Sequence, residues 1–112
     1  MYIEHVAIWT KNLKTLTDFY TDYSQAESRT KYVNPDKGFE STFLTFSSGA
    51  RLEVMKMLSI PDSLNDPETQ FTGINHLAFS VGSMGQVDSL TARLRSDGYR
   101  VVDGPRPTGD GY

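Results

Sequence analysis

The sequence predicts an α+β fold built around a βα unit that occurs twice. The stretch IEHVAI at residues 3–8 returns as INHLAF at residues 74–79, which places His76 71 positions after His5 (76 − 5 = 71). The same displacement relates polar and apolar residues further along: Asn12 and Ser83, Leu16 and Val87, Phe19 and Leu90, Tyr23 and Leu94. A match without gaps across a strand pattern and the helix pattern after it indicates internal duplication.

Length and charge restrict the class of protein. The chain has 112 residues, a net charge of −3 and no cysteine. We expect one domain without disulfides, and no nucleic-acid partner, because phosphate binding requires a basic face. No apolar run approaches the roughly 20 residues of a membrane span, and no signal peptide is visible. The sequence therefore predicts a soluble, cytoplasmic domain.

The first module begins with an alternating strand over residues 2–9, which places His5 and Val6 on opposite faces. Asn12 is a good N-cap for a helix over residues 13–24, whose apolar stripe is expected to cover the Val6 face. His5 should then lie on the face that no helix covers.

The rest of the first module is expected to be β-structure. A short extended piece near residues 29–33 precedes two alternating runs, 39–46 and 51–58, which are separated by a small Gly-containing loop and predict a β-hairpin. Module one therefore reads β-α-β-β-β over residues 1–58.

Residues 59–72 have loop composition and are expected to form a linker within a single domain over 1–112. The second module, 73–112, should contain a strand over 74–81, a helix capped by Ser83, a turn at Gly98 and a strand over 100–102. By the repeat displacement Tyr112 corresponds to Ser41, so this module lacks the C-terminal strands of the first. We expect the sequence to be a truncated or partly ordered version of a longer chain; the alternative is that another chain supplies the missing strands.

Three residues carry the candidate chemistry. His5 and His76 hold equivalent repeat positions, and Glu53 lies on a strand face whose neighbours are Met55 and Met57. If the uncovered faces of the two modules share a cavity, two imidazoles and one carboxylate converge as ligands for a divalent metal such as Zn, Ni, Co, Mn or Fe. Burial of a carboxylate among apolar neighbours also requires a partner.

Structural readings compete with this one. A lone histidine on a strand is commonly a surface or core residue, and Glu53 could pair with Arg51 or face solvent. Trp9, Phe43, Met55 and Met57 could line a substrate cavity, although such residues are more often core. The matched histidines together with Glu53 favour the metal site.

The pieces IEHVAI, LTDFY at residues 16–20, RLEV at 51–54 and GINHLAF at 73–79 resemble the vicinal oxygen chelate superfamily of glyoxalase I, bleomycin-resistance proteins and extradiol dioxygenases. The resemblance implies two tandem βαβββ modules, with paired curled sheets around a cavity that holds one divalent metal. It assigns His5, Glu53 and His76 as ligands, and Glu53, or a carboxylate beyond Tyr112, as the catalytic base. A fourth ligand would lie beyond Tyr112.

Two positions depart from the glutathione-dependent glyoxalase I pattern, because Trp9 stands where an Arg is expected and Met57 where an Asn is expected. The resemblance therefore implies a metal-dependent glyoxalase-like lyase or isomerase that acts on a small substrate with vicinal oxygens and is not glutathione-specific. The alternatives are a metal-free small-molecule-binding protein of the bleomycin-resistance type and an extradiol-type dioxygenase. We expect a homodimer.

Overall fold

The computed structural model describes residues 1–109 and 111, and it divides into two compact units, Met1–Ser63 and Leu64–Tyr112. The division falls inside the segment 59–72, which contains no helix or strand. Asp110, part of the expected C-terminal loop, and Tyr112 lie outside the described residues. Each unit is described by itself.

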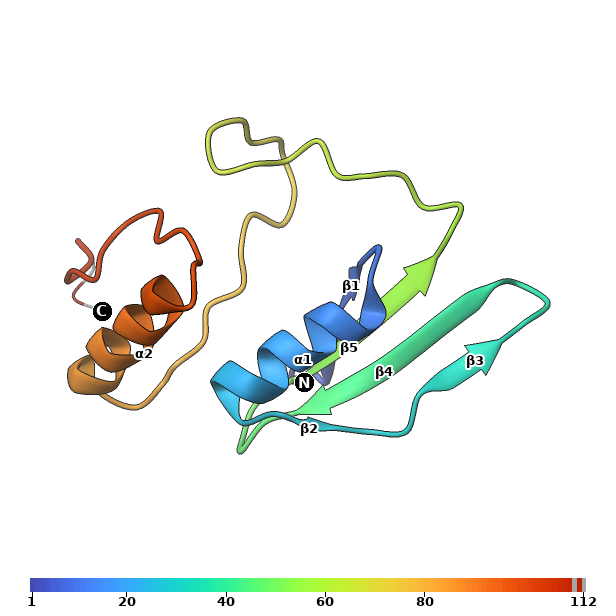
Figure 1. Cartoon of the computed structure of the whole chain (residues 1–112), viewed down its shortest axis with the longest axis horizontal. Helices are drawn as coiled ribbons and strands as arrows, with labels where there is room; N and C mark the ends of the chain where they lie inside the picture. The colour runs from blue at the N-terminus through green and yellow to red at the C-terminus, as the bar shows by residue number, and fades with distance from the viewer. Residues whose placement is uncertain (110, 112) are drawn as a thin grey trace. The chain divides into compact units, whose positions relative to one another are not determined.

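The first unit is built on an open, mixed β-sheet (Figure 1). Its strands are β1 (His5–Trp9), β2 (Glu27–Ser28), β3 (Tyr32–Asn34), β4 (Phe39–Thr45) and β5 (Arg51–Met57). The strand order is β1-β5-β4-β2, and β3 also pairs with β4. Strand β1 runs parallel to β5, whereas β2, β3 and β5 are antiparallel to β4. The predicted hairpin is confirmed as β4–β5.

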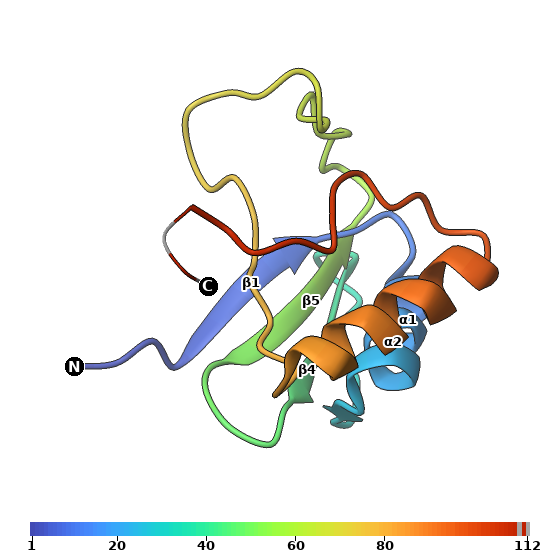
Figure 2. The same cartoon turned by 90° about the vertical axis from the view of Figure 1, so that its left-hand side faces the viewer.

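Helix α1 (Leu13–Ser24) lies across one face of this sheet, as Figures 1 and 2 show. Asn12 caps it as predicted, because its side-chain oxygen accepts a hydrogen bond from Thr15 N at 3.0 Å. The core lies between α1 and the sheet, and its buried apolar residues are Leu13, Ala26, Leu44, Leu52 and Val54. In β1 the half-buried residues are Val6 and Ile8, which confirms that the helix covers the face opposite His5.

The second strand of the predicted module is interrupted. Glu27 pairs with Thr45 in β2, and Tyr32 pairs with Ser41 in β3, so that the register against β4 shifts by one residue between them. One extra residue in the segment 29–31 produces this shift, as in a β-bulge. Arg29 nonetheless stays attached to β4, because its N–H donates to Phe43 O at 2.9 Å and its carbonyl accepts from Thr42 Oγ1 at 2.8 Å.

The second unit contains the helix α2 (Met84–Ser96) and no strand among residues 64–109. Ser83 caps α2 as predicted, accepting from Gln86 N at 3.2 Å. Gly98 takes φ = +94° after the helix, the left-handed conformation that glycine adopts without strain. Neither α1 nor α2, the helices of the described part, is long and apolar enough to cross a membrane.

The prediction of strands over residues 74–81 and 100–102 is wrong, because neither segment forms a strand in the structure. An alternating apolar pattern forms a strand only where another strand supplies the ladder of hydrogen bonds. No such partner is available to either segment within the described residues of the second unit, because that unit contains no hairpin equivalent to β4–β5.

Candidate metal-binding site

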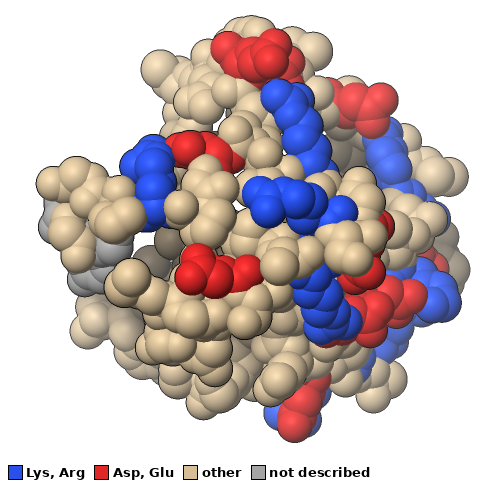
Figure 3. All heavy atoms as spheres, turned by 60° about the vertical axis from the view of Figure 1, so that its left-hand side comes forward, with Lys and Arg blue, Asp and Glu red and all other residues tan. Residues whose placement is uncertain are grey.

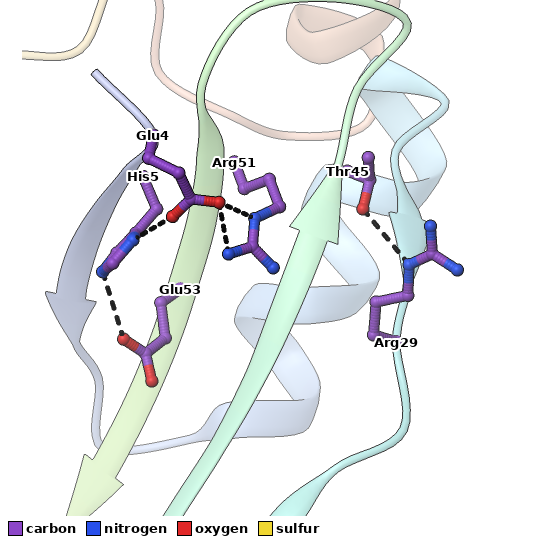
Figure 4. Close-up of polar contacts among 6 residues, drawn as sticks. All are labelled: Glu4, His5, Arg29, Thr45, Arg51 and Glu53. Carbon is purple, nitrogen blue, oxygen red and sulfur yellow. Dashed lines mark hydrogen bonds and ion pairs between the residues drawn. The ribbon is translucent and has the colours of Figure 1, made fainter. Parts of the chain in front are cut away.

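His5 and Glu53 meet on the face of the sheet that α1 does not cover. In the parallel pairing of β1 with β5, His5 lies opposite Arg51 and Ala7 lies opposite Glu53. Residues two apart share a face, so His5 and Glu53 are diagonal neighbours. Their Nε2 and Oε2 atoms lie 3.9 Å apart, and the side chain of Glu53 is only 17% exposed. Figure 4 draws this contact as a dashed line between the two side chains.

The other ring nitrogen of His5 is held by Glu4. The distance from Nδ1 to Glu4 Oε2 is 2.5 Å, and the second carboxylate oxygen of Glu4 accepts from Arg51 Nε at 2.6 Å. The hydrogen bond with His5 is the main cause that holds the pKa of the Glu4 carboxyl below its ordinary value, and the hydrogen bond and charge of Arg51 act in the same direction. Glu4 is therefore a carboxylate at neutral pH, and it can only accept hydrogen bonds.

The donor set suits a divalent metal. A neutral imidazole whose Nδ1–H is bound to a carboxylate presents a bare Nε2 lone pair, the arrangement found around metal-ligating histidines. Two ligands at about 2.1 Å from one ion lie roughly 3.0–3.4 Å apart, so that a small side-chain rotation would bring His5 and Glu53 into range. Among residues 1–109 and 111 no group of three His, Cys, Asp or Glu side chains is placed to hold a metal ion.

His76, the third predicted ligand, belongs to the second unit and is exposed. Its Nδ1 lies 2.7 Å from Asn75 Oδ1. The amide of Asn75 is held in turn, because its Nδ2 donates to Gln70 Oε1 at 2.6 Å. The structure therefore brings His5 and Glu53 together and describes His76 in its own local setting.

The residues predicted to line a substrate cavity lie on the same face as His5. Phe43 pairs with Glu53 across β4 and β5, and its ring meets the His5 ring edge to face at a centroid distance of 5.4 Å. Trp9 is 43% exposed and packs edge to face on Phe39. Met55 and Met57 are partly buried along β5. The face around His5 and Glu53 is thus largely apolar.

Sequence reasoning missed the role of Glu4 and assigned Arg51 as an alternative partner of Glu53. In the structure Arg51 pairs with Glu4 instead, and its guanidinium carbon lies 4.2 Å above the ring of Phe43. Strand alternation would have turned Glu4 away from His5. Glu4 is the residue before β1 and its carbonyl accepts from Arg51 N–H at 3.0 Å, yet its side chain contacts both His5 and Arg51.

A shallow hollow of about 370 Å³ lies away from this site, between α1 and strands β2, β4 and β5. Its charged lining residues are Lys14, Arg29, Lys31, Lys56, Asp18 and Glu40. Lys14 pairs with Asp18, and Lys31 Nζ lies 3.2 Å from Glu40 Oε1. Arg29 donates to Thr45 Oγ1 at 3.4 Å, as Figure 4 also shows. Basic side chains therefore outnumber acidic ones in the lining of this hollow. Figure 3 shows one face of the molecule, on which Lys and Arg side chains lie beside Asp and Glu side chains.

Comparison with solved structures identifies related folds. Trypanothione-dependent glyoxalase I from Leishmania major is 19% identical with a TM-score of 0.77, and the match covers 100% of this chain and 75% of that one. A mutant of the fosfomycin resistance protein FosX from Listeria monocytogenes, in complex with Mn(II) and a dihydroxypropylphosphonic acid, is 23% identical with a TM-score of 0.68, covering 96% and 76%. A glyoxalase family protein from Enterococcus faecalis is 26% identical with a TM-score of 0.66, covering 86% and 71%.

No curated protein sequence matches the chain. A family model described as the glyoxalase/bleomycin resistance protein/dioxygenase superfamily matches residues 4–112, which is nearly the whole sequence. That match spans the Glu4–His5 pair, Glu53 and His76 alike. The chain belongs to the glyoxalase/bleomycin resistance protein/dioxygenase superfamily.

Proposed function

We propose that the protein is a divalent-metal-dependent, glyoxalase-like enzyme that performs lyase or isomerase chemistry on a small substrate with vicinal oxygens. The observation that carries the proposal is the placement of His5 Nε2 3.9 Å from Glu53 Oε2, on an apolar face, with the opposite ring nitrogen bound to Glu4. This pair offers one nitrogen and one oxygen ligand to the same ion. The metal is Zn, Ni, Co, Mn or Fe.

Each residue of the proposed site has its own role. The proposed ligands of the ion are His5, Glu53 and His76. The bound ion would supply Lewis-acid polarisation of the substrate oxygens. Glu53 retains a second carboxylate oxygen, with which it would take and return a proton as general base. Trp9 and Phe43 would cover an apolar part of the substrate and keep water from it.

Substrate preference follows from the same face. By the resemblance, the glutathione-dependent enzymes carry an Arg and an Asn at the positions of Trp9 and Met57, and both of these side chains are apolar. We therefore propose that glutathione adducts are poor substrates. We also propose that the active form is a cytoplasmic homodimer; light scattering of the purified protein tests the dimer.

Metal binding is the first test. Titration calorimetry with Zn²⁺, Ni²⁺ and Mn²⁺, beside metal analysis of the purified protein, should show about one ion per chain. The double variant His5→Ala/His76→Ala should bind none. Equal binding by the parent and the double variant would contradict the proposed ligands, and no binding by the parent would favour a metal-free small-molecule-binding protein.

Turnover tests the role of Glu53. With methylglyoxal and a series of thiols as probes, Glu53→Gln should lose activity while its unfolding curve stays close to that of the parent. Glu40→Gln is the matched control, because Glu40 lies on β4 and pairs with Lys31 on the α1 side of the sheet. Full activity in Glu53→Gln would contradict the proposal. Oxygen-dependent cleavage of catechols by the Fe²⁺ form would instead favour an extradiol-type dioxygenase.

A further inference from the structure

Both histidines have the same local contact, although they lie in different units. The ring Nδ1 of His5 meets the side-chain oxygen of the preceding residue, Glu4, at 2.5 Å. The ring Nδ1 of His76 meets the side-chain oxygen of the preceding residue, Asn75, at 2.7 Å. Glu4 and Asn75 are themselves equivalent in the 71-residue repeat (75 − 4 = 71).

From this repeated contact we propose that Glu4 and Asn75 are positioning residues, which keep the proton of the following histidine on Nδ1 and leave Nε2 bare for a ligand. The inference rests on the proposed metal-dependent function for its purpose, although the contacts exist without a metal. A carboxylate can only accept, so a hydrogen bond to Glu4 requires His5 Nδ1 to donate. The tautomer of a histidine is set in this way by the partner of its other nitrogen.

The Glu4 carboxylate, which accepts from His5, is itself bound by Arg51, and Arg51 in turn packs on Phe43. Arg51 donates to Glu4 Oε1 from both Nε, at 2.6 Å, and a terminal nitrogen. The guanidinium in turn lies over the ring of Phe43 at 4.2 Å, and the rings of Phe43 and His5 meet edge to face at a centroid distance of 5.4 Å. Figure 4 shows Glu4 between His5 and Arg51, with Glu53 on the far side of the imidazole. The ring is therefore restrained on one edge and open at Nε2.

The acceptor at His76 is held differently. Asn75 Nδ2 donates to Gln70 Oε1 at 2.6 Å, which turns the amide oxygen toward His76. The acceptor is a neutral amide, whereas Glu4 is a carboxylate. Charge-assisted hydrogen bonds are roughly twice as strong as neutral ones. We therefore expect a firmer tautomer at His5 than at His76.

Nitrogen NMR of the metal-free full chain tests the inference directly. At about pH 8, where imidazole in water is neutral, both rings of the parent should carry the proton on Nδ1, with a stronger preference at His5. Glu4→Ala should redistribute the proton at His5 only, and Asn75→Ala at His76 only, so that each variant is the control for the other. Glu27→Ala, an exposed position on β2, should change neither ring.

Conservative variants separate positioning from general structure. Glu4→Gln and Asn75→Asp retain an acceptor oxygen and should restore the Nδ1–H form. Arg51→Met leaves the Glu4 acceptor in place and should weaken the preference of His5 for the Nδ1–H form. A proton on Nε2 in the parent, or rings that Glu4→Ala and Asn75→Ala leave unchanged, would overturn the inference.

Metal affinity then distinguishes the inference from the function on which it rests. Loss of an outer partner of a ligating histidine weakens metal binding by about 10–100-fold, and Glu4→Ala should fall in that range in calorimetry with Zn²⁺. If the tautomer of His5 depends on Glu4 but the chain binds no metal, the positioning role stands and the proposed function is contradicted. Unchanged tautomer and affinity in Glu4→Ala would remove the positioning role while the metal site stands.

Discussion

The two units carry the same motif and fold it differently. In the first, IEHVAI contributes the strand β1, whereas in the second, INHLAF forms no strand. The apolar pattern of the two stretches is nearly identical, so propensity does not explain the difference. Strand β1 has β5 as a parallel partner over five residues, and the second unit has no equivalent of β5 in its described part. A strand is therefore a property of a pair of segments rather than of one.

Burial follows the same division. The first unit has a core in which Leu44 and Val54 are fully buried. In the second unit α2 has no buried residue, and Ile74 remains 76% exposed. Most helical stability comes from packing an amphipathic face against other elements. The first unit is thus expected to determine the stability of the chain as described.

Amide hydrogen exchange should separate the units most strongly. Strand β5 has partners on both sides, so the Val54 amide should open only with global unfolding, slowing its exchange by about 10³-fold or more. The Leu77 amide should exchange at nearly the rate of an unstructured peptide. The mid-helix Leu90 amide should lie between them. Comparable slow exchange at Leu77 and Val54 would show that the second motif pairs as a strand in solution.

Core truncation should also affect one unit only. Leu44→Ala removes a fully buried side chain and should lower the free energy of unfolding by about 2–5 kcal/mol. Val87→Ala on α2, where the side chain is 41% exposed, should change it by no more than about 0.5 kcal/mol. Urea denaturation followed by circular dichroism measures both. Equal effects would mean that the α2 stripe is buried in solution.

The two helix caps have similar geometry and allow a finer comparison. Asn12→Ala should cost about 1 kcal/mol in the unfolding of the first unit, and Asn12→Asp should restore most of it. Ser83→Ala should reduce the helical signal of α2 and leave the urea midpoint of the first unit unchanged. A shift of that midpoint by Ser83→Ala would show that the units unfold together.

The smallest effect concerns a contact within the second unit. Arg106 donates to both carboxylate oxygens of Asp103 from Nε, at 3.0 and 3.2 Å, and this hydrogen bonding together with the charge of Arg106 lowers the pKa of Asp103. Because the folded-state pKa of Asp103 is depressed, the stability that this contact contributes is fully present above the unfolded-state pKa. That stability is lost as the pH falls through the folded-state pKa. A carboxyl carbon titration should show the low midpoint, and Arg106→Gln should return it to the ordinary range.

Much of the local structure follows from residues that are close in the chain. Asn12 and Ser83 identified both helix starts, and Gly98 identified the end of α2, since capping depends on neighbours within a few positions. The alternation of β4 and β5 placed Glu53 on the uncovered face. The repeat itself singled out His5 and His76, and the site residues taken from it remain predictions.

Other features needed the tertiary structure. The break between β2 and β3 depends on how the segment 29–31 meets β4, and no local signal marks it. The Glu4–Arg51 pair joins residues 47 positions apart, and it exists because β1 lies parallel to β5. The sequence by itself therefore determined the helices, their caps and the hairpin, whose interactions join neighbouring stretches of the chain. Only the tertiary structure decided which apolar stretch became a strand, because ladder hydrogen bonds require a partner that the pattern cannot supply.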